Sequence, residues 1–390
     1  MGHSRRRRGA KAAAGELARL RLIALNLAGL PRAVVCALAR DRSRWLEGAP
    51  TVLAEDRALP ATAAQRSVAA RALERAGETA GEELERARRI GARVVTLVDD
   101  DYPPPLLDLP LPPPVLYLRG TAPARPALAI VGSRKASAYA LEVAALFAEE
   151  LARHGVWVVS GLARGVDGAA HRGALEAPGG RTAAVLGCGV DVEYPRRREN
   201  LHERIGERGA LLSEFPLGTR PRPQNFPIRN RIIAALASTV LVAEGTARSG
   251  SLITARLALD LGRDVAAVPG RIFEPAAQGP NALIRDGALP ALHPSDLLDT
   301  LPLPDRDLLA PAPSGPTLAP PPGDTGRLLA ALAEAPSTPE QLAAATSLPI
   351  EEVLARLLDL ELAGHIRRHP GALWALSPRH ALAKVRPSDS

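Results

Sequence analysis

The chain has 390 residues, of which 46% are hydrophobic and 23% charged; this leaves room for two or three domains and excludes a wholly disordered protein. No stretch approaches the roughly eighteen uninterrupted apolar residues of a membrane-spanning helix, and no signal-peptide pattern is evident, so we expect a cytoplasmic protein. The formal net charge is +7, but Arg5 to Arg8 supply four of these charges, so charge alone does not establish a nucleic-acid partner. Cys36 and Cys188 are far apart and no histidines cluster, which argues against a disulfide framework and a zinc site.

The first fifteen residues include four consecutive arginines, Arg5 to Arg8. A run of like charges is usually solvated, so we predict a disordered basic tail over residues 1–15. The alternative, that this tail is an arm that binds nucleic acid, stays open.

Residues 16–118 are predicted to form a small helical domain followed by a proline-rich connector. Apolar residues recur with helical spacing over Glu16–Arg40 and Thr62–Arg89, and a Gly-Leu-Pro sequence at residues 29–31 should break the first helical stretch. The prolines of Pro103–Pro114 indicate an extended connector. Such a module either packs against the rest of the chain or binds DNA backbone, and we favour packing.

Residues 119–300 alternate between apolar, β-branched runs and helical stretches. The strand-like runs are Leu128–Val131, Val156–Val159, Ala183–Leu186, Ala210–Leu212, Val240–Ala243 and Val265–Val268. Helical segments between them are Leu141–Ala152, Ile232–Ala237 and Leu252–Leu261. Because apolar strands joined by helices are typical of parallel sheets covered on both faces, we predict a doubly wound α/β domain of Rossmann type.

A proline-rich linker and a second small domain follow. Eight of the 23 residues in 301–323 are proline, without apolar periodicity, which predicts a linker. Residues 324–380 show three helical segments and a hairpin, the order of a winged helix, a module that binds DNA or docks proteins. The third helix, Ile350–Leu362, carries four acidic residues against one arginine. We therefore favour protein contact or packing over binding of a polyanion.

Three turns that should lie at the carboxyl edge of the sheet combine glycine or serine with arginine. Along the chain they contain Gly132, Ser133 and Arg134, then Gly161, and then Ser249, Gly250 and Ser251. Doubly wound sheets bind ligands at this edge, where helix N-termini hold anions and arginine adds paired donors. Since neither GxGxxG after the first strand nor GxxxxGK[ST] occurs, we expect a phosphate site without a cofactor.

A further positive element spans Pro221–Arg231, where Phe226 stands among arginines. An aromatic ring flanked by guanidinium groups suits a stacked base and a held backbone, as in sites for single-stranded nucleic acid. The alternative, that Phe226 fills a gap against the sheet and Arg231 caps a carbonyl, is equally compatible with the spacing.

The same region shows no recognisable catalytic arrangement. Asp167 and His171 lie four residues apart, but Asp167 is expected to cap a helix and no third metal ligand accompanies His171. Ser133 and Ser160 have no base beside them in the sequence, and Cys188 follows an apolar strand as a buried small side chain would. We therefore expect no catalytic residue, no metal and no enzyme activity.

Six sequence blocks stand out between residues 128 and 290. They are Ile130–Arg134, Ser160–His171, Val185–Pro195, Phe226–Ile233, Ser249–Ala255 and Val268–Gly270. In this order the blocks resemble the DNA-processing protein DprA (Smf) family. The helical domain before them and the winged helix after them resemble the family's common three-part layout.

The resemblance implies a non-enzymatic protein that binds single-stranded DNA, protects incoming strands and loads the RecA recombinase during natural transformation. It also implies a homodimer formed through the end of the α/β domain, which points to Leu283 and Ile284.

The resemblance further implies the residues of the site. Arg134 would hold a phosphate, and Phe226, Arg229 and Arg231 would line the same pocket, with Phe226 near a base. The basic residues that flank the family's motifs correspond here to Arg196 and Arg222.

A nucleotide-processing hydrolase of the related Rossmann superfamily is the alternative function. Those proteins are expected to carry a glutamate near Pro-Gly-Gly-x-Gly-Thr, whereas here residues 178–182 read Pro-Gly-Gly-Arg-Thr, without the second glycine. A DNA-binding regulator led by the winged helix is a third possibility, disfavoured by the acidic third helix.

Overall fold

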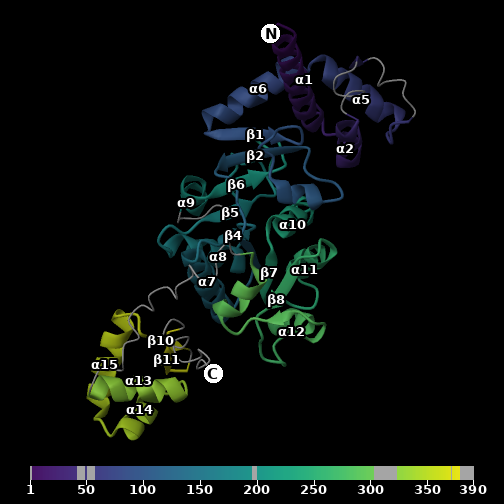
Figure 1. The fold of residues 1–390 in the computed structure, drawn as a ribbon. Coiled ribbons are helices and arrows are strands. Elements are labelled where there is room, and N and C mark those ends of the chain that lie inside the picture. Colours follow the sequence, from purple (N-terminus) through teal and green to yellow (C-terminus); the bar gives the residue numbers. More distant parts are fainter. Residues whose placement is uncertain are drawn as a thin grey trace. The chain divides into compact units, whose positions relative to one another are not determined.

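Figure 1 shows the protein as a computed structural model, which describes residues 2–41, 49–50, 58–195, 200–302, 323–369 and 371–377. The chain divides into two compact units, Met1–Leu303 and Pro304–Ser390. Most of the predicted linker at residues 301–323 lies outside the described residues. Within the described part of the chain, no helix is both long and apolar enough to cross a membrane.

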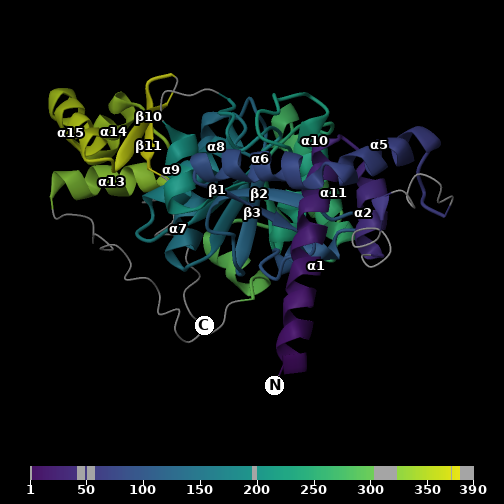
Figure 2. The same ribbon diagram turned by 90° about the horizontal axis from the view of Figure 1, so that it is seen from above.

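Helices form the N-terminal layer of the first unit (Figure 2). They include α1 (Gly2–Leu27), α2 (Arg32–Arg40), α5 (Ala63–Glu74) and α6 (Ala76–Arg89). The predicted break at residues 29–31 is confirmed, because Gly29 adopts a φ of +69° and Pro31 precedes α2. Helix α1 begins at Gly2, which differs from the disordered tail predicted over residues 1–15; the alanines at positions 10 and 12–14 have the highest helix propensity and extend the helix backwards.

A nine-stranded sheet forms the centre of the first unit, in the order β1-β2-β6-β5-β4-β3-β7-β8-β9. The strands are β1 (Ala92–Thr96), β2 (Val115–Gly120), β3 (Ala127–Gly132), β4 (Trp157–Ser160), β5 (Thr182–Val185), β6 (Ala210–Ser213), β7 (Thr239–Glu244), β8 (Asp264–Ala267) and β9 (Leu289–Pro290). All pairs from β6 across to β9 are parallel, which confirms the six predicted strands and the α/β class. Strand β3 lies between β4 and β7, where the winding of the chain reverses and such sheets bind ligands.

The first two strands extend this sheet at one edge. Strand β1 pairs with β2, and β2 with β6, both in antiparallel orientation. The boundary predicted at residue 118 therefore falls inside β2, and the segments 16–118 and 119–300 share one sheet. Local apolar patterns do not reveal a strand's distant partner, which explains the difference. The proline-rich connector also contains a short 3-10 helix, η1 (Pro104–Asp108), since proline is tolerated in a first helical turn.

Helices cover both faces of the sheet. Alternate residues of a strand point to opposite faces: Leu128 and Ile130 pack with α7 (Ala138–Arg153) and α8 (Val166–Glu176). On the other face, Ala129 and Val131 pack with α10 (Asn225–Leu236) and α11 (Gly250–Asp260). The remaining helical elements of this unit are α9 (Leu201–Arg208), η2 (Pro275–Ala277), α12 (Gln278–Arg285) and η3 (Pro294–Thr300).

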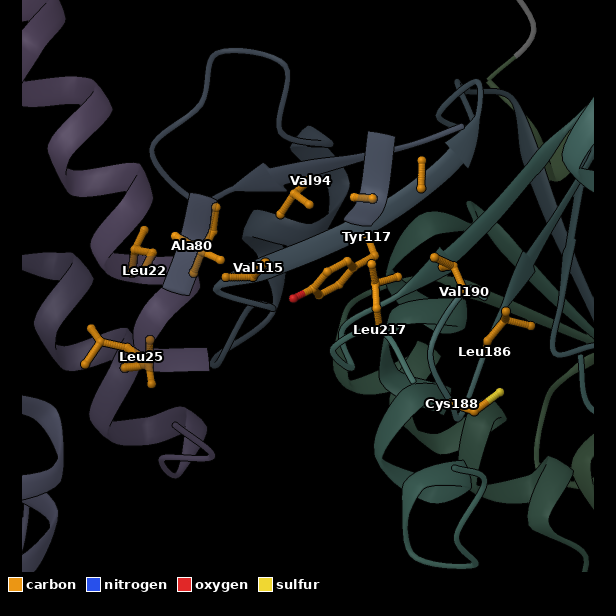
Figure 3. Packing of buried hydrophobic residues seen from close by; sticks show 14 of the residues in the cluster. Leu22, Leu25, Ala80, Val94, Val115, Tyr117, Leu186, Cys188, Val190 and Leu217 are labelled. Carbon is orange, nitrogen blue, oxygen red and sulfur yellow. The ribbon is translucent and has the colours of Figure 1, made fainter. Parts of the chain in front are cut away.

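A further apolar cluster joins the N-terminal helices to the sheet (Figure 3). Leu22 and Leu25 of α1 share this cluster with Tyr117 of β2. Leu186 and Leu217, from the loops that follow β5 and β6, complete it on the side of the sheet. The helical module thus packs against the sheet, as favoured from the sequence.

The second unit has the predicted winged-helix order. It contains α13 (Asp324–Glu334), α14 (Pro339–Thr346), α15 (Ile350–Leu362), β10 (Ile366–His369) and β11 (Leu373–Leu376). The two strands pair in antiparallel register. The single arginine of α15, Arg356, forms ion pairs with Glu352 (2.6 Å) and Asp324 (3.0 Å). Its charge is therefore largely neutralised within the unit.

Candidate nucleic-acid interface

The turns that follow the strands meet in a cleft of about 390 Å³ at the carboxyl edge of the sheet. Seven of the twelve predicted site residues line this cleft: Gly132, Arg134, Phe226, Arg229, Ser249, Gly250 and Ser251. Close packing explains the glycine at the end of β3, because a Cβ atom on Gly132 would lie 2.6 Å from Cγ2 of Val166. The switch point predicted from the topology therefore coincides with a real cavity.

One wall of the cleft is the N-terminus of α11. Ser249 is the N-cap, its Oγ lies 2.8 Å from Oγ of Ser251, and Gly250 between them is exposed. The first N–H groups of a helix have no partner within the helix, and the helix dipole adds partial positive charge there. This wall therefore offers hydroxyl and backbone donors to an anion such as a phosphate.

The cleft is also lined by an aromatic ring beside an exposed arginine. The guanidinium carbon of Arg134 lies 4.8 Å from the centroid of the Phe226 ring. Tyr194 stands against the other part of this ring, with centroids 5.6 Å apart and planes tilted by 42°. The pair of rings offers an apolar surface of the size of a nucleobase, and Arg134 adds a positive charge at its edge.

Arg229 has a different position from the one that the family resemblance implies. Its side chain lines the cleft from below but is only 3% exposed. Nη1 donates hydrogen bonds to the carbonyl oxygens of Gly161 (2.7 Å) and Val185. Burial lowers the pKa of Arg229 to about 10, partly offset by the nearby Asp167 carboxylate, so the group stays charged at neutral pH. Arg229 therefore holds two strand ends together beneath Phe226, 5.8 Å from its ring.

Gly161 and Ser133 support this arrangement through their backbones and do not line the cleft. A Cβ atom on Gly161 would lie 2.2 Å from Nη2 of Arg229, so only glycine leaves room for the buried guanidinium. The carbonyl oxygen of Ser133 accepts a hydrogen bond from the N–H of Val166 (3.2 Å), which ties the turn after β3 to the start of α8.

Arg231 does not line the cleft, in contrast to the expectation from the resemblance. Its Nη2 donates to Oε2 of Glu214 (2.5 Å), and Arg32 of α2 donates to the same oxygen (3.0 Å). Residues two apart on a helix differ by about 200° in direction. Arg229 and Arg231 therefore point to opposite sides of α10, and Arg231 fastens the N-terminal helices to the sheet.

The last two predicted basic site residues are Arg222, which is not among the described residues that line the cleft, and Arg196. Arg222 is exposed, and its neighbours Pro221 and Pro223 both line the cleft. Arg196 lies outside the described residues.

The residues considered for catalysis have structural partners. Asp167 lies in the first turn of α8, whose N-cap is Gly165, so the predicted capping role is wrong; its carboxylate accepts from the N–H of Ala163 (3.3 Å). Burial raises the pKa of Asp167, while Arg229 opposes that shift. His171 accepts from the N–H of Leu162 at Nε2 (3.3 Å), and its Nδ1 lies 2.7 Å from Oγ1 of Thr182.

The serine and cysteine candidates are buried as well. Ser160 donates to the carbonyl oxygen of Ile130 (2.6 Å). Cys188 is 1% exposed, and burial raises the pKa of its thiol to about 11, which suits a small core side chain and not a nucleophile.

Sequence reasoning missed two groups that shape the cleft. Tyr194 was seen only as part of a motif, although its ring covers Phe226. Asn225 donates to the carbonyl oxygen of Gly187 (3.0 Å) and so fixes the first turn of α10. The only signal for either was its place next to a proline or a phenylalanine in the chain.

Comparison with known proteins agrees with this architecture. Residues 93–302 match the family model described as DNA recombination-mediator protein A, and residues 311–372 match the DprA winged helix domain. The chain is 43% identical over 277 residues to Protein Smf of Escherichia coli, which covers 69% of this chain and 74% of that protein. It is 41% identical over 205 residues to DNA processing protein DprA of Streptococcus pneumoniae, covering 52% of this chain and 72% of that protein.

A solved structure gives the same result in three dimensions. The X-ray structure of DNA processing protein A from Streptococcus pneumoniae superposes with a TM-score of 0.63 at 31% identity, covering 73% of this chain and 98% of that one. The first family model spans more than half of the present chain. The cleft, the fold and these matches together show that this chain belongs to the DNA recombination-mediator protein A family, also called DprA or Smf.

Proposed function

We propose that the protein binds single-stranded DNA in the cleft between β3, α10 and α11. The observation that carries this proposal is the partly exposed Phe226 ring, which lies in the same cleft as the N-terminus of α11, with the Tyr194 ring 5.6 Å and the Arg134 guanidinium carbon 4.8 Å from its centroid. A base can stack on the aromatic pair while phosphates meet Arg134 and the helix donors. Bases of a duplex are already stacked and paired, so the cleft favours single strands.

The wider role follows from the family. We place the protein in DNA processing in the cytoplasm, where it protects incoming single strands and loads RecA onto them, acting as a binding protein and not as an enzyme. The alternative hydrolase needs a side chain that can exchange protons with a substrate, and Asp167 and His171 both accept backbone hydrogen bonds instead. Dimerisation through α12 is part of the proposal; Ile284 is its candidate contact, since Leu283 packs against the core.

Fluorescence anisotropy tests the binding site directly. Oligo-dT should bind well ahead of a blunt duplex. Arg134→Ala removes a charge-assisted contact of roughly 1.5–3 kcal/mol and should weaken binding about ten- to hundredfold. The matched control is Arg88→Ala, an exposed arginine on α6 that does not line the cleft. Equal affinity for duplex and single strand, or an unchanged Arg134→Ala, would contradict the assignment of the cleft.

Two further experiments test the contribution of residues 5–8 to DNA binding and the loading of RecA. Deleting residues 5–8, four arginines near the start of α1, should mainly flatten the salt dependence, because charges that neutralise phosphates act through counterion release with a slope of about 0.7 per phosphate. For RecA, the lag of its ATPase on oligonucleotides coated with single-strand-binding protein should shorten when wild type is added. If DNA binding is intact but the lag of the RecA ATPase is unchanged, RecA loading is refuted and the proposed single-strand binding is not.

A further inference from the structure

A turn after β8 exposes two large apolar side chains. Ile272 is 76% and Phe273 91% exposed, at the tip of the turn that the N–H of Glu274 closes onto the carbonyl oxygen of Arg271 (3.0 Å). Turn tips usually carry glycine, asparagine, aspartate, proline or serine. Neither apolar side chain is buried by the fold, so packing in the described structure does not account for them.

The turn lies at the same edge of the sheet as the cleft. Strands β7 and β8 are parallel, so the chain leaves both at the carboxyl edge. The segment after the turn is bonded to the turn after β7: the N–H of Gly245 donates to Ala276 (2.7 Å), and Gly245 accepts from the N–H of Gly279 (2.8 Å). A Cβ atom on Gly245 would in turn lie 2.9 Å from Cβ of Ser249, which lines the cleft. The exposed tip is therefore continuous with one wall of the site.

The chemistry of the tip repeats that of the cleft. Phe273 lies two residues after Arg271, whose exposed side chain (87%) is 3.6 Å from the carboxylate of Glu274, and Arg248 is exposed in the turn after β7. An exposed ring beside guanidinium groups is the combination that holds successive nucleotides of a single strand. Two of these three charged side chains are positive, and the net positive charge that Arg248 leaves favours a polyanion over an apolar protein surface.

We propose that Phe273 is a second base-stacking platform, which with Arg271 extends the single-strand path beyond the cleft and past the start of α11. This inference rests on the proposed single-strand binding. The occupant is a nucleotide of the same strand that enters the cleft at Phe226. A strand long enough to reach both rings gains a contact that a short strand cannot make.

The test is the length dependence of binding to oligo-dT of about four to sixteen nucleotides. Phe273→Ala should bind the shortest strands like wild type and bind long strands roughly five- to hundredfold more weakly, the effect of losing one stacked base. Phe273→Trp should keep wild-type affinity and show quenching of its added fluorescence by long strands only. Leu107→Ala is the matched control, since Leu107 is also an exposed apolar residue (57%) and does not line the cleft.

The outcomes separate this inference from the function on which it rests. If wild type binds no strand of any length, the proposed function fails. If wild type binds but Phe273→Ala matches it at every length, only the second platform is refuted. A Phe273→Ala variant that changes only the sedimentation coefficient would identify the tip as a contact between copies of the chain and would also overturn the proposal. Thermal melting of each variant verifies that the fold is intact.

Discussion

Replacing Arg229 by alanine should destabilise the protein first and affect DNA binding only as a consequence. The substitution removes hydrogen bonds to the carbonyl oxygens of Gly161 and Val185 and leaves the buried carboxylate of Asp167 without its nearest compensating charge. Removing one partner from a buried charged arrangement costs about 3–5 kcal/mol. Since domains are stable by about 5–15 kcal/mol in total, a third or more of the stability is at stake.

The assay is urea denaturation of the full chain alongside oligo-dT binding. With a slope of about 1–3 kcal/mol per molar urea, Arg229→Ala should lower the midpoint by more than about 1 M. Arg134→Ala is the matched comparison: its side chain is exposed, so its free energy of unfolding should stay within about 0.5 kcal/mol of wild type while its affinity for oligo-dT falls. Arg229→Lys keeps the charge but loses the planar guanidinium, whose Nη1 donates to both carbonyl oxygens and whose Nε donates to Asn230, and should recover little. A fully stable Arg229→Ala that has lost DNA binding would refute this reasoning and make Arg229 a direct DNA contact.

Two other predictions concern the packing around the site. Glu214→Ala removes a buried carboxylate, leaves the partly buried Arg231 guanidinium unpaired and should cost about 3–5 kcal/mol in the same denaturation assay, whereas affinity for oligo-dT below the melting temperature should change little. For His202, burial lowers the pKa below its ordinary value of 6.5, so only the unfolded chain takes up this proton as the pH falls. Stability should therefore decline from about pH 6.5 downward, and His202→Gln should flatten the decline; an equal slope in that variant would assign it to other groups.

The fold could be predicted from the sequence where a strand has a clear local apolar pattern and pairs with the other strands of the parallel sheet. Each of the six apolar runs from Leu128 to Val268 forms a parallel strand, because a strand buried on both faces carries its signature within four residues. Strands β1 and β2 were not placed in that sheet from the sequence. Strand β2 pairs in antiparallel orientation with β6, about ninety residues further along the chain, and β1 joins the sheet only through β2; no local pattern records the distant partner.

The chemistry of the site could be predicted from the sequence, but the directions in which its arginine side chains point could not. Glycine and serine after β3 and before α11 indicate an anion site, since parallel strands bring such turns to one edge. The direction of each arginine on α10 depends on what the helix packs against. The family resemblance implied the same pocket role for Arg229 and Arg231, although Arg229 is buried near the ring and Arg231 pairs with Glu214.

The block from Phe226 to Arg231 therefore combines three different tasks in six residues. Phe226 faces the cleft, Arg229 joins the ends of two strands beneath it, and Arg231 ties α10 to Glu214 and, through that carboxylate, to Arg32. Loss of DNA binding after substitution of the buried Arg229 would not identify a DNA contact, because displacement of Phe226 gives the same result. Stability and affinity measured together separate these cases: a residue that touches DNA lowers affinity at constant stability, and a residue that positions Phe226 lowers both.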